Sequence, residues 1–82
     1  MLIPVTITVG NNIDDTTFTV NANRGVRSIL KKPAGYENYD IHYWSLDKEG
    51  TQPIGYNATN YGMYAAYDTT IYIQYVPKGT AV

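Results

Sequence analysis

The chain has 82 residues, one histidine and no cysteine. This length allows a single domain, and the lack of thiols excludes disulfides, thiolate metal sites and cysteine nucleophiles. A formal net charge of −1 provides no field that would hold a nucleic-acid backbone or an anionic membrane. No apolar run approaches the roughly 20 residues that cross a bilayer, and no signal peptide is recognised at the start. We therefore expect one small cytoplasmic domain without a cofactor.

The first two predicted strands form a hairpin. Residues 2–9 alternate with a period of two, which is typical of a strand with one buried face. Residues 16–23 alternate in the same way, with Phe18, Val20 and Ala22 facing inward. The segment between them is rich in Gly, Asn and Asp, which suit a turn.

The period changes after Asn23. Val26, Ile29 and Leu30 have the i, i+3, i+4 spacing of a helix with one apolar face. Asn23 suits the N-cap position, and Pro33 would end the helix. The sequence thus predicts a helix of two to three turns, which is stable only when it packs on a sheet.

The second half of the chain is predicted to add three strands. Residues 39–46 alternate, residues 51–56 return as a short edge strand in which Pro53 is tolerable, and residues 69–76 form the last strand. Residues 57–68 are interpreted as a long irregular connection with room for one helical turn.

These elements together predict an α+β fold. A hairpin and a helix bury both apolar faces only if the helix packs across the sheet, and the last strand then lies beside the first and parallel to it. This arrangement is the β-grasp, with a mixed four- to five-stranded sheet and one short helix. We expect residues 1–76 to form the domain and residues 77–82 a flexible carboxy-terminal tail.

Over essentially its whole length, the chain resembles ubiquitin and its relatives. The family's opening hairpin is matched by MLIPVTITV and TTFTV, and its closing pattern by NATNYGMYAAYDTTIYIQYVPKG. The stretch VRSILKKPAGYENYDIHYW resembles bacterial ubiquitin-like domains of conjugation-type operons. Within the closing pattern, the matching positions are the family's loop tyrosine, its inward aliphatic residues and its outward residues: Tyr61; Ile71 and Ile73; Tyr72 and Gln74.

The tail departs from that of conjugated ubiquitins, because Gly79 is single, follows Pro77 and Lys78, and is not the last residue. The resemblance implies that a peptidase removes residues 80–82 and that an activating enzyme then uses the Gly79 carboxylate for transfer to protein targets. Lys78 and Gly79 are the predicted processing and conjugation residues. A glycine lets a backbone approach catalytic atoms closely. The alternative is an ordinary frayed terminus.

The resemblance also implies a partner-binding face on the side of the sheet away from the helix. Exposed aromatic side chains on such a face suit a recognition hot spot. A register slip of one residue would instead turn Trp44 inward and Tyr43 outward. The residues expected on this face are Thr6, Thr8, His42, Trp44, Tyr72 and Gln74.

We find no set of residues typical of a catalytic or metal site. His42 is the single histidine, so neither a histidine metal cluster nor a nucleophile–base pair can form. The carboxylates of Asp14, Asp15, Asp47 and Glu49 lie in predicted turns, which explains them without a metal ion.

The sequence thus predicts a non-enzymatic bacterial or phage protein modifier that binds neither nucleic acid nor a membrane. One alternative is a non-conjugated interaction adaptor or small phage protein that uses the aromatic face. Another is a structural subunit that assembles through an exposed edge strand.

Overall fold

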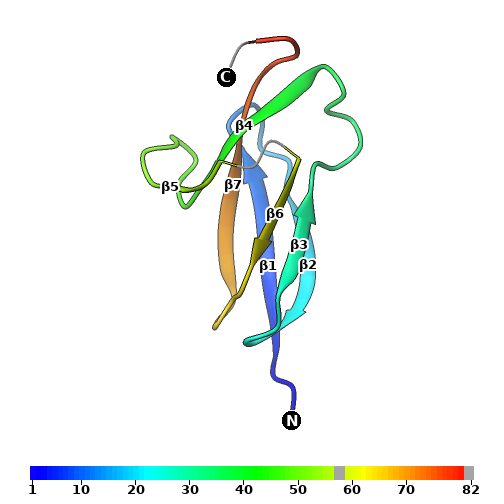
Figure 1. The fold of residues 1–82 in the computed structure, drawn as a ribbon, viewed down its shortest axis with the longest axis vertical. Helices are drawn as coiled ribbons and strands as arrows, with labels where there is room; N and C mark the ends of the chain where they lie inside the picture. Colours follow the sequence, from blue (N-terminus) through cyan, green and yellow to red (C-terminus); the bar gives the residue numbers. More distant parts are fainter. Residues whose placement is uncertain (57–58, 81–82) are drawn as a thin grey trace.

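The computed structural model describes residues 1–56 and 59–80. Within these residues the chain forms seven strands and no helix (Figure 1). The strands are β1 (Pro4–Asn11), β2 (Phe18–Asn23), β3 (Ser28–Lys31), β4 (Tyr39–Ser45), β5 (Pro53–Gly55), β6 (Asn60–Met63) and β7 (Thr69–Pro77).

Five of these strands form the main sheet, in the order β2-β1-β7-β4-β5. The hairpin of β1 and β2 pairs Ile7 with Val20, which confirms the predicted opening hairpin. Strand β7 lies between β1 and β4, parallel to β1 and antiparallel to β4. The predicted position of the last strand beside the first is therefore confirmed, as is a mixed sheet of five strands.

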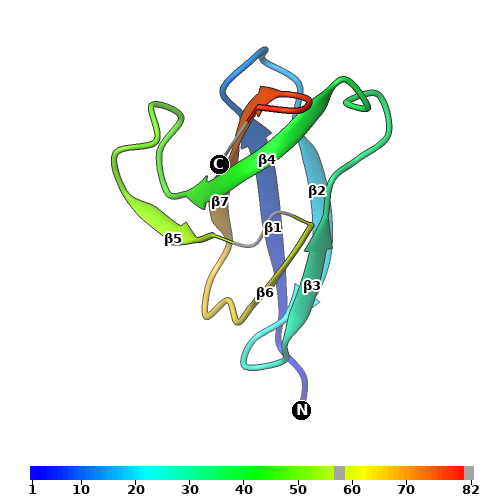
Figure 2. The same ribbon diagram turned by 45° about the horizontal axis from the view of Figure 1, so that its top comes forward.

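The predicted helix is wrong, and with it the α+β, β-grasp assignment. Residues 28–31 form β3, which pairs antiparallel with β6 and places Leu30 opposite Tyr61. A helix here would have to fit between Gly25, which has a φ of 76°, and Pro33. A helix of that length is unstable in isolation. Pairing with β6 instead satisfies the backbone groups of β3 that face it. Figures 1 and 2 show β3 and β6 lying over one face of the main sheet, where the helix was expected.

The expected irregular connection over residues 57–68 is also corrected, because it contains β6. Residues 57 and 58 lie outside the described part of the chain. The remaining residues of this connection form no helical turn.

The hydrophobic core lies between the main sheet and the β3–β6 pair. Trp44 is completely buried at its centre, and its ring stacks on Tyr61 with the centroids 5.5 Å apart. The aliphatic side chains that fill the core come from β1, β3, β4 and β7, so both layers contribute to it. The largest fully buried aliphatic residues are Ile7, Val9, Leu30, Ile41, Ile71 and Ile73.

A bulge in β4 decides which way Trp44 points. Ile41 pairs with Tyr75 and Tyr43 pairs with the adjacent Gln74, so His42 is an extra residue in β4. Such a bulge shifts the alternation of side chains by one position. Ile41 and Trp44 therefore both face the core although they are three residues apart. The predicted outward Trp44 is wrong, and the alternative, with Trp44 inward and Tyr43 outward, is the one observed.

Candidate functional site

The face of the main sheet away from β3 and β6, here called the outer face, carries a row of threonines. Thr8 of β1 lies beside Thr19 of β2 and Thr70 of β7. Thr6 and Thr8 are half-buried, as is Tyr72 in the same face. These three predicted partner-binding residues therefore share one face, on a surface that is mainly hydroxyl-bearing rather than aromatic.

Gln74 belongs to the outer face but is covered by the turn between β4 and β5. Its side-chain amide donates to the Ser45 hydroxyl at 3.0 Å and to the Lys48 carbonyl at 2.9 Å. The Tyr43 hydroxyl donates to the Gly50 carbonyl at 2.7 Å. Gln74 is only 6% exposed, so it holds this turn in place and is not available to a partner.

The other two residues of the predicted aromatic face are not on it together. His42 is exposed at the bulge, where its ring meets Tyr43 edge-on at 4.9 Å. Trp44 is in the core. The structure therefore does not assemble the predicted group of His42, Trp44 and Tyr72.

The segment that begins at Pro77 is hydrogen-bonded to β4 and the loop before it. Pro77 ends β7 opposite Tyr39. The Lys78 N–H donates to the Asn38 carbonyl at 2.9 Å, and the Gly79 N–H donates to the Asp40 carboxylate at 3.1 Å. These bonds would have to break before Gly79 could enter an enzyme's active-site channel.

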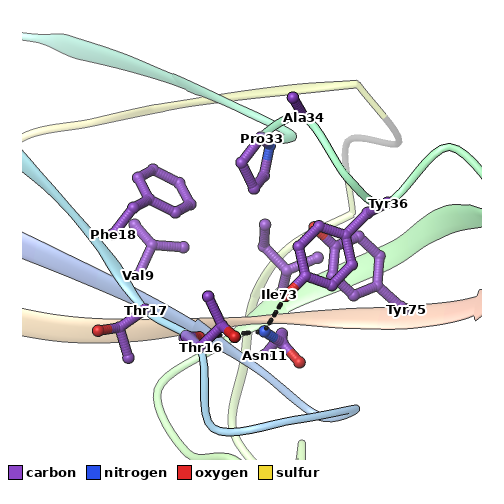
Figure 3. A pocket seen from close by; sticks show the side chains of 11 residues that line it. Val9, Asn11, Thr16, Thr17, Phe18, Pro33, Ala34, Tyr36, Ile73 and Tyr75 are labelled. Carbon is purple, nitrogen blue, oxygen red and sulfur yellow. Dashed lines mark hydrogen bonds between the residues drawn. The ribbon is translucent and has the colours of Figure 1, made fainter.

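A small pocket lies between the start of β2 and the loop after β3. Figure 3 shows Phe18 on one side, Tyr36 and Tyr75 on the other, and Pro33 between them. Its volume is about 80 Å³, well below the roughly 300 Å³ at which small-molecule sites begin. The pocket is therefore too small for a substrate or cofactor of ordinary size.

The polar groups at the pocket form a network around Asn11. Its side-chain amide donates to the Asp14 carboxylate at 3.0 Å and to the Tyr36 hydroxyl at 3.3 Å. That hydroxyl in turn donates to Asp14 at 2.9 Å. The amide of Asn11 is the main cause that lowers the pKa of Asp14. This network fixes the β1–β2 turn, and the prediction from sequence assigned Asn11 to a turn and Tyr36 to a loop without proposing either as a site residue.

A second hollow, of about 200 Å³, lies on the outer face beside Tyr72. The Lys48 ammonium group crosses it, donating to the Asp14 carbonyl at 2.9 Å and to the Asp15 carboxylate at 3.0 Å. The opposite charges at this hollow already pair with each other, so it shows no unsatisfied charge for a ligand.

The free edge of β2 is the feature most suited to binding. β1 covers one side of β2, and among the described residues no strand pairs with its other side. The strand reads FTVNAN, with neither a charge nor a proline. The opposite edge of the sheet, β5, has only three residues and begins with Pro53. Short strands, charges and proline are the features that protect sheet edges from unwanted pairing, and β2 has none of them.

Charges lie just beyond each end of β2. Asp14 and Asp15 come before it, and Arg24 and Arg27 follow it. The Arg24 side chain donates to the Ala66 carbonyl at 2.7 Å and lies over the ring of Tyr67. The edge is therefore uncharged along its length, acidic at its beginning and basic at its end. A pattern of this kind could have been recognised in the sequence once the strand order was known.

Comparison of the chain with protein-family models, with curated proteins and with solved structures found no match. Among residues 1–56 and 59–80, no group of three or more histidine, aspartate or glutamate side chains is placed to hold a metal ion. Over the same residues, no helix is long and apolar enough to cross a membrane.

Proposed function

We propose that the protein is a non-enzymatic interaction module that binds an extended segment of a polypeptide along the free edge of β2. The observation that supports this proposal is the difference between the two edges of the main sheet. β5 is short and begins with a proline, whereas β2 is six residues long and unprotected. A reducing cytoplasm would suit this chain, because it contains no cysteine.

Strand addition explains how such an edge would bind. In an antiparallel pair, alternate residues direct their backbone N–H and C=O groups toward the neighbouring strand, and the others direct theirs away from it. The outward groups of β2 would bond to the incoming segment, and these main-chain bonds would provide the affinity. Thr19 and Asn21 are exposed beside this edge on the outer face, whereas Phe18 and Val20 offer partly buried apolar surface on the inner face.

The modifier hypothesis remains a prediction from resemblance. It requires a tail that is free to enter an activating enzyme, and Gly79 is instead hydrogen-bonded to Asp40. No contact of the described residues favours this function over binding at β2, so we do not adopt it as a second candidate.

The proposal is tested with a displayed library of random peptides about as long as β2. Selected peptides should bind the wild-type protein, and the amide resonances that shift should be those of residues 18–23. Val20→Lys should weaken binding by about tenfold or more, because an inward-pointing charge on an edge strand opposes further pairing.

The matched control is Ile54→Lys, which places the same charge on the opposite edge of the sheet. Ile54 is a partly buried aliphatic residue, like Val20, and this variant should bind the peptides as the wild type does. Failure to select any peptide at concentrations at which the chain is monomeric would overturn the proposal. So would peptides that shift the resonances of Thr6, Thr8 and Thr70, because the binding surface would then be the outer face.

A further inference from the structure

We infer that the polypeptide segment that pairs with β2 is the β2 strand of a second copy of this chain. The inference depends on the proposed function, because it names the partner of the same edge. The two strands would run antiparallel around a two-fold axis that is perpendicular to the sheet and passes beside Val20. Three observations support a second copy as the partner of β2. They are the side chains that would meet, the charges at the ends of β2, and the strands that would form the edges of the joined sheet.

The side chains of β2 complement one another in this register. With Val20 opposite its own copy, Phe18 lies opposite Ala22, and Thr19 lies opposite Asn21. Phe18 and Ala22 both face inward, so a large ring meets a small side chain. Thr19 and Asn21 are both exposed on the outer face, where a hydroxyl meets an amide. Directly opposite pairs of this kind stabilise antiparallel strands.

A shift of this register by one residue is unfavourable. It would place inward residues such as Val20 opposite outward residues such as Asn21, because side chains alternate between the faces with a period of two. The two-fold arrangement around Val20 instead keeps the inner faces of both copies on the same side. Their apolar layers then continue from one copy to the other.

The charges at the ends of β2 favour the antiparallel direction. In this arrangement Arg24 of one copy lies opposite Thr16 of the other, next to the acidic pair Asp14 and Asp15, and the symmetry repeats this contact. The side chain of Asp15 is fully exposed, although it also pairs with Lys48 at 3.0 Å, and Arg24 is held at the end of β2 by its bond to the Ala66 carbonyl. A parallel pairing would place like charges together at both ends. Complementary charges of this kind determine register and suppress the wrong arrangement.

Dimerisation would also remove the one unprotected edge of the main sheet. The joined sheet would have β5 at both ends, and β5 is short and begins with Pro53. Because a two-fold interface uses the same surface of both subunits, the assembly closes at two copies and does not continue into a filament. The structure therefore points to a dimer and not to an open polymer.

Cysteine cross-linking tests the register directly, because the natural chain has no cysteine. Opposite residues of antiparallel strands have Cα atoms about 4.5–5.5 Å apart, which lies within the roughly 4.4–6.8 Å of a disulfide. Val20→Cys should therefore form a covalent dimer under mild oxidation. Thr19→Cys should not cross-link to itself, because its own copy lies diagonally at about 7–8 Å. A mixture of Thr19→Cys and Asn21→Cys should form the mixed dimer.

Sedimentation velocity of the wild-type chain over a range of concentrations provides the second measurement. We expect a monomer–dimer equilibrium, and Val20→Lys should sediment as a monomer at every concentration. A wild type that is monomeric throughout, or a Thr19→Cys chain that cross-links as readily as Val20→Cys, would overturn the inference. If the chain is monomeric but library peptides still bind at β2, the dimer is wrong and the proposed function holds. If neither pairing occurs, both are wrong.

Discussion

The ring of Tyr36 lies on the ring of Tyr75, with their centroids 4.8 Å apart and their planes at 9°. The two hydroxyl groups have different surroundings. That of Tyr36 bonds to Asp14 and Asn11, whereas that of Tyr75 is buried and has no hydrogen-bond partner among the described residues. Burial is the main cause that raises the pKa of the Tyr75 hydroxyl. An unsatisfied buried hydroxyl lowers stability, so removing it should raise the free energy of unfolding.

Tyr75→Phe should therefore stabilise the protein, by about 1 kcal/mol. Tyr36→Phe should destabilise it by a similar amount, about 1 kcal/mol, because it removes a bonded hydroxyl from an equivalent ring. Urea denaturation of both variants provides the free energies of unfolding. A loss in Tyr75→Phe as large as that in Tyr36→Phe would show that the Tyr75 hydroxyl does have a partner.

Replacement of Trp44 tests its position in the core. Trp44→Ala should lower the free energy of unfolding by about 3–5 kcal/mol, because it leaves a large cavity, and this is a considerable part of the roughly 5–15 kcal/mol that stabilises a domain. Trp44→Phe should cost less. The exposed neighbour provides the control: His42→Ala should change stability by no more than about 0.5 kcal/mol. Thermal denaturation followed by circular dichroism measures all three, and equal effects of Trp44→Ala and His42→Ala would contradict the buried position.

Stability should fall in acid because of Asp14 and Asp47. Hydrogen bonds lower the pKa of both carboxyl groups in the folded state. The largest contribution comes from the Asn11 amide for Asp14 and from the Thr51 hydroxyl for Asp47. A lowered folded-state pKa contributes stability above the unfolded-state pKa of about 3.9, and this stability is lost as the pH falls through the folded-state pKa. Urea denaturation from neutral pH into acid should show this decline. It should become shallower in Asp14→Asn, and shallower still when Asp47→Asn is added. Decline curves of the same steepness in all three proteins would refute the assignment.

Two glycines with similar backbone angles separate conformational strain from steric crowding. Gly50 has a φ of 78°, and a Cβ there would lie 2.5 Å from the Tyr43 hydroxyl oxygen, whereas Gly25 has a φ of 76° and no atom within 4 Å of such a Cβ. Gly25→Ala should cost about 1 kcal/mol from the left-handed backbone alone. Gly50→Ala should lower the free energy of unfolding by about 1–3 kcal/mol more than Gly25→Ala does, because the added Cβ overpacks the turn. Equal losses in chemical denaturation would mean that the turn over Gln74 moves freely.

Much of the main sheet could be predicted from the sequence, because its strands are half-buried. β1, β2 and β7 each alternate apolar and polar or half-exposed residues, since one face meets the core and the other meets solvent. The position of β7 beside β1 was predicted by an argument that assumed a helix across the sheet, and the β3–β6 pair takes the place of that helix. The edge position of β2 depends on that same strand order.

The second layer could not be predicted, because its strands carry little local signal. β3 has only Ile29 and Leu30 as apolar residues, and their spacing from Val26 is the i, i+3, i+4 spacing of an amphipathic helix. Its partner β6 reads NYGM, and Asn and Gly are unfavourable in strands. Only the pairing of the two segments, distant in sequence, determines their structure. Tertiary contacts thus prevailed over a weak local pattern.

The prediction for Trp44 failed at a single extra residue, whereas Gln74 is unavailable because the turn between β4 and β5 covers it. Regular alternation along β4 places Trp44 outward, and the bulge at His42 reverses every position after it. Neither His42 nor its neighbours are residues that mark a bulge by themselves. The predicted binding face therefore lost its main aromatic residue, while Thr6, Thr8 and Tyr72, which precede or avoid the bulge, lie on the outer face.

The central position of β7 has a consequence for how the chain folds during synthesis. β7 is the last of the seven strands to leave the ribosome, yet it joins the β1–β2 hairpin to β4 and β5. Until it emerges, the two halves have no common partner, and their inner edges stay open to other nascent chains. Closing such long loops late makes folding slow. A translation that stalls before Thr69 would thus release two half-sheets prone to aggregation.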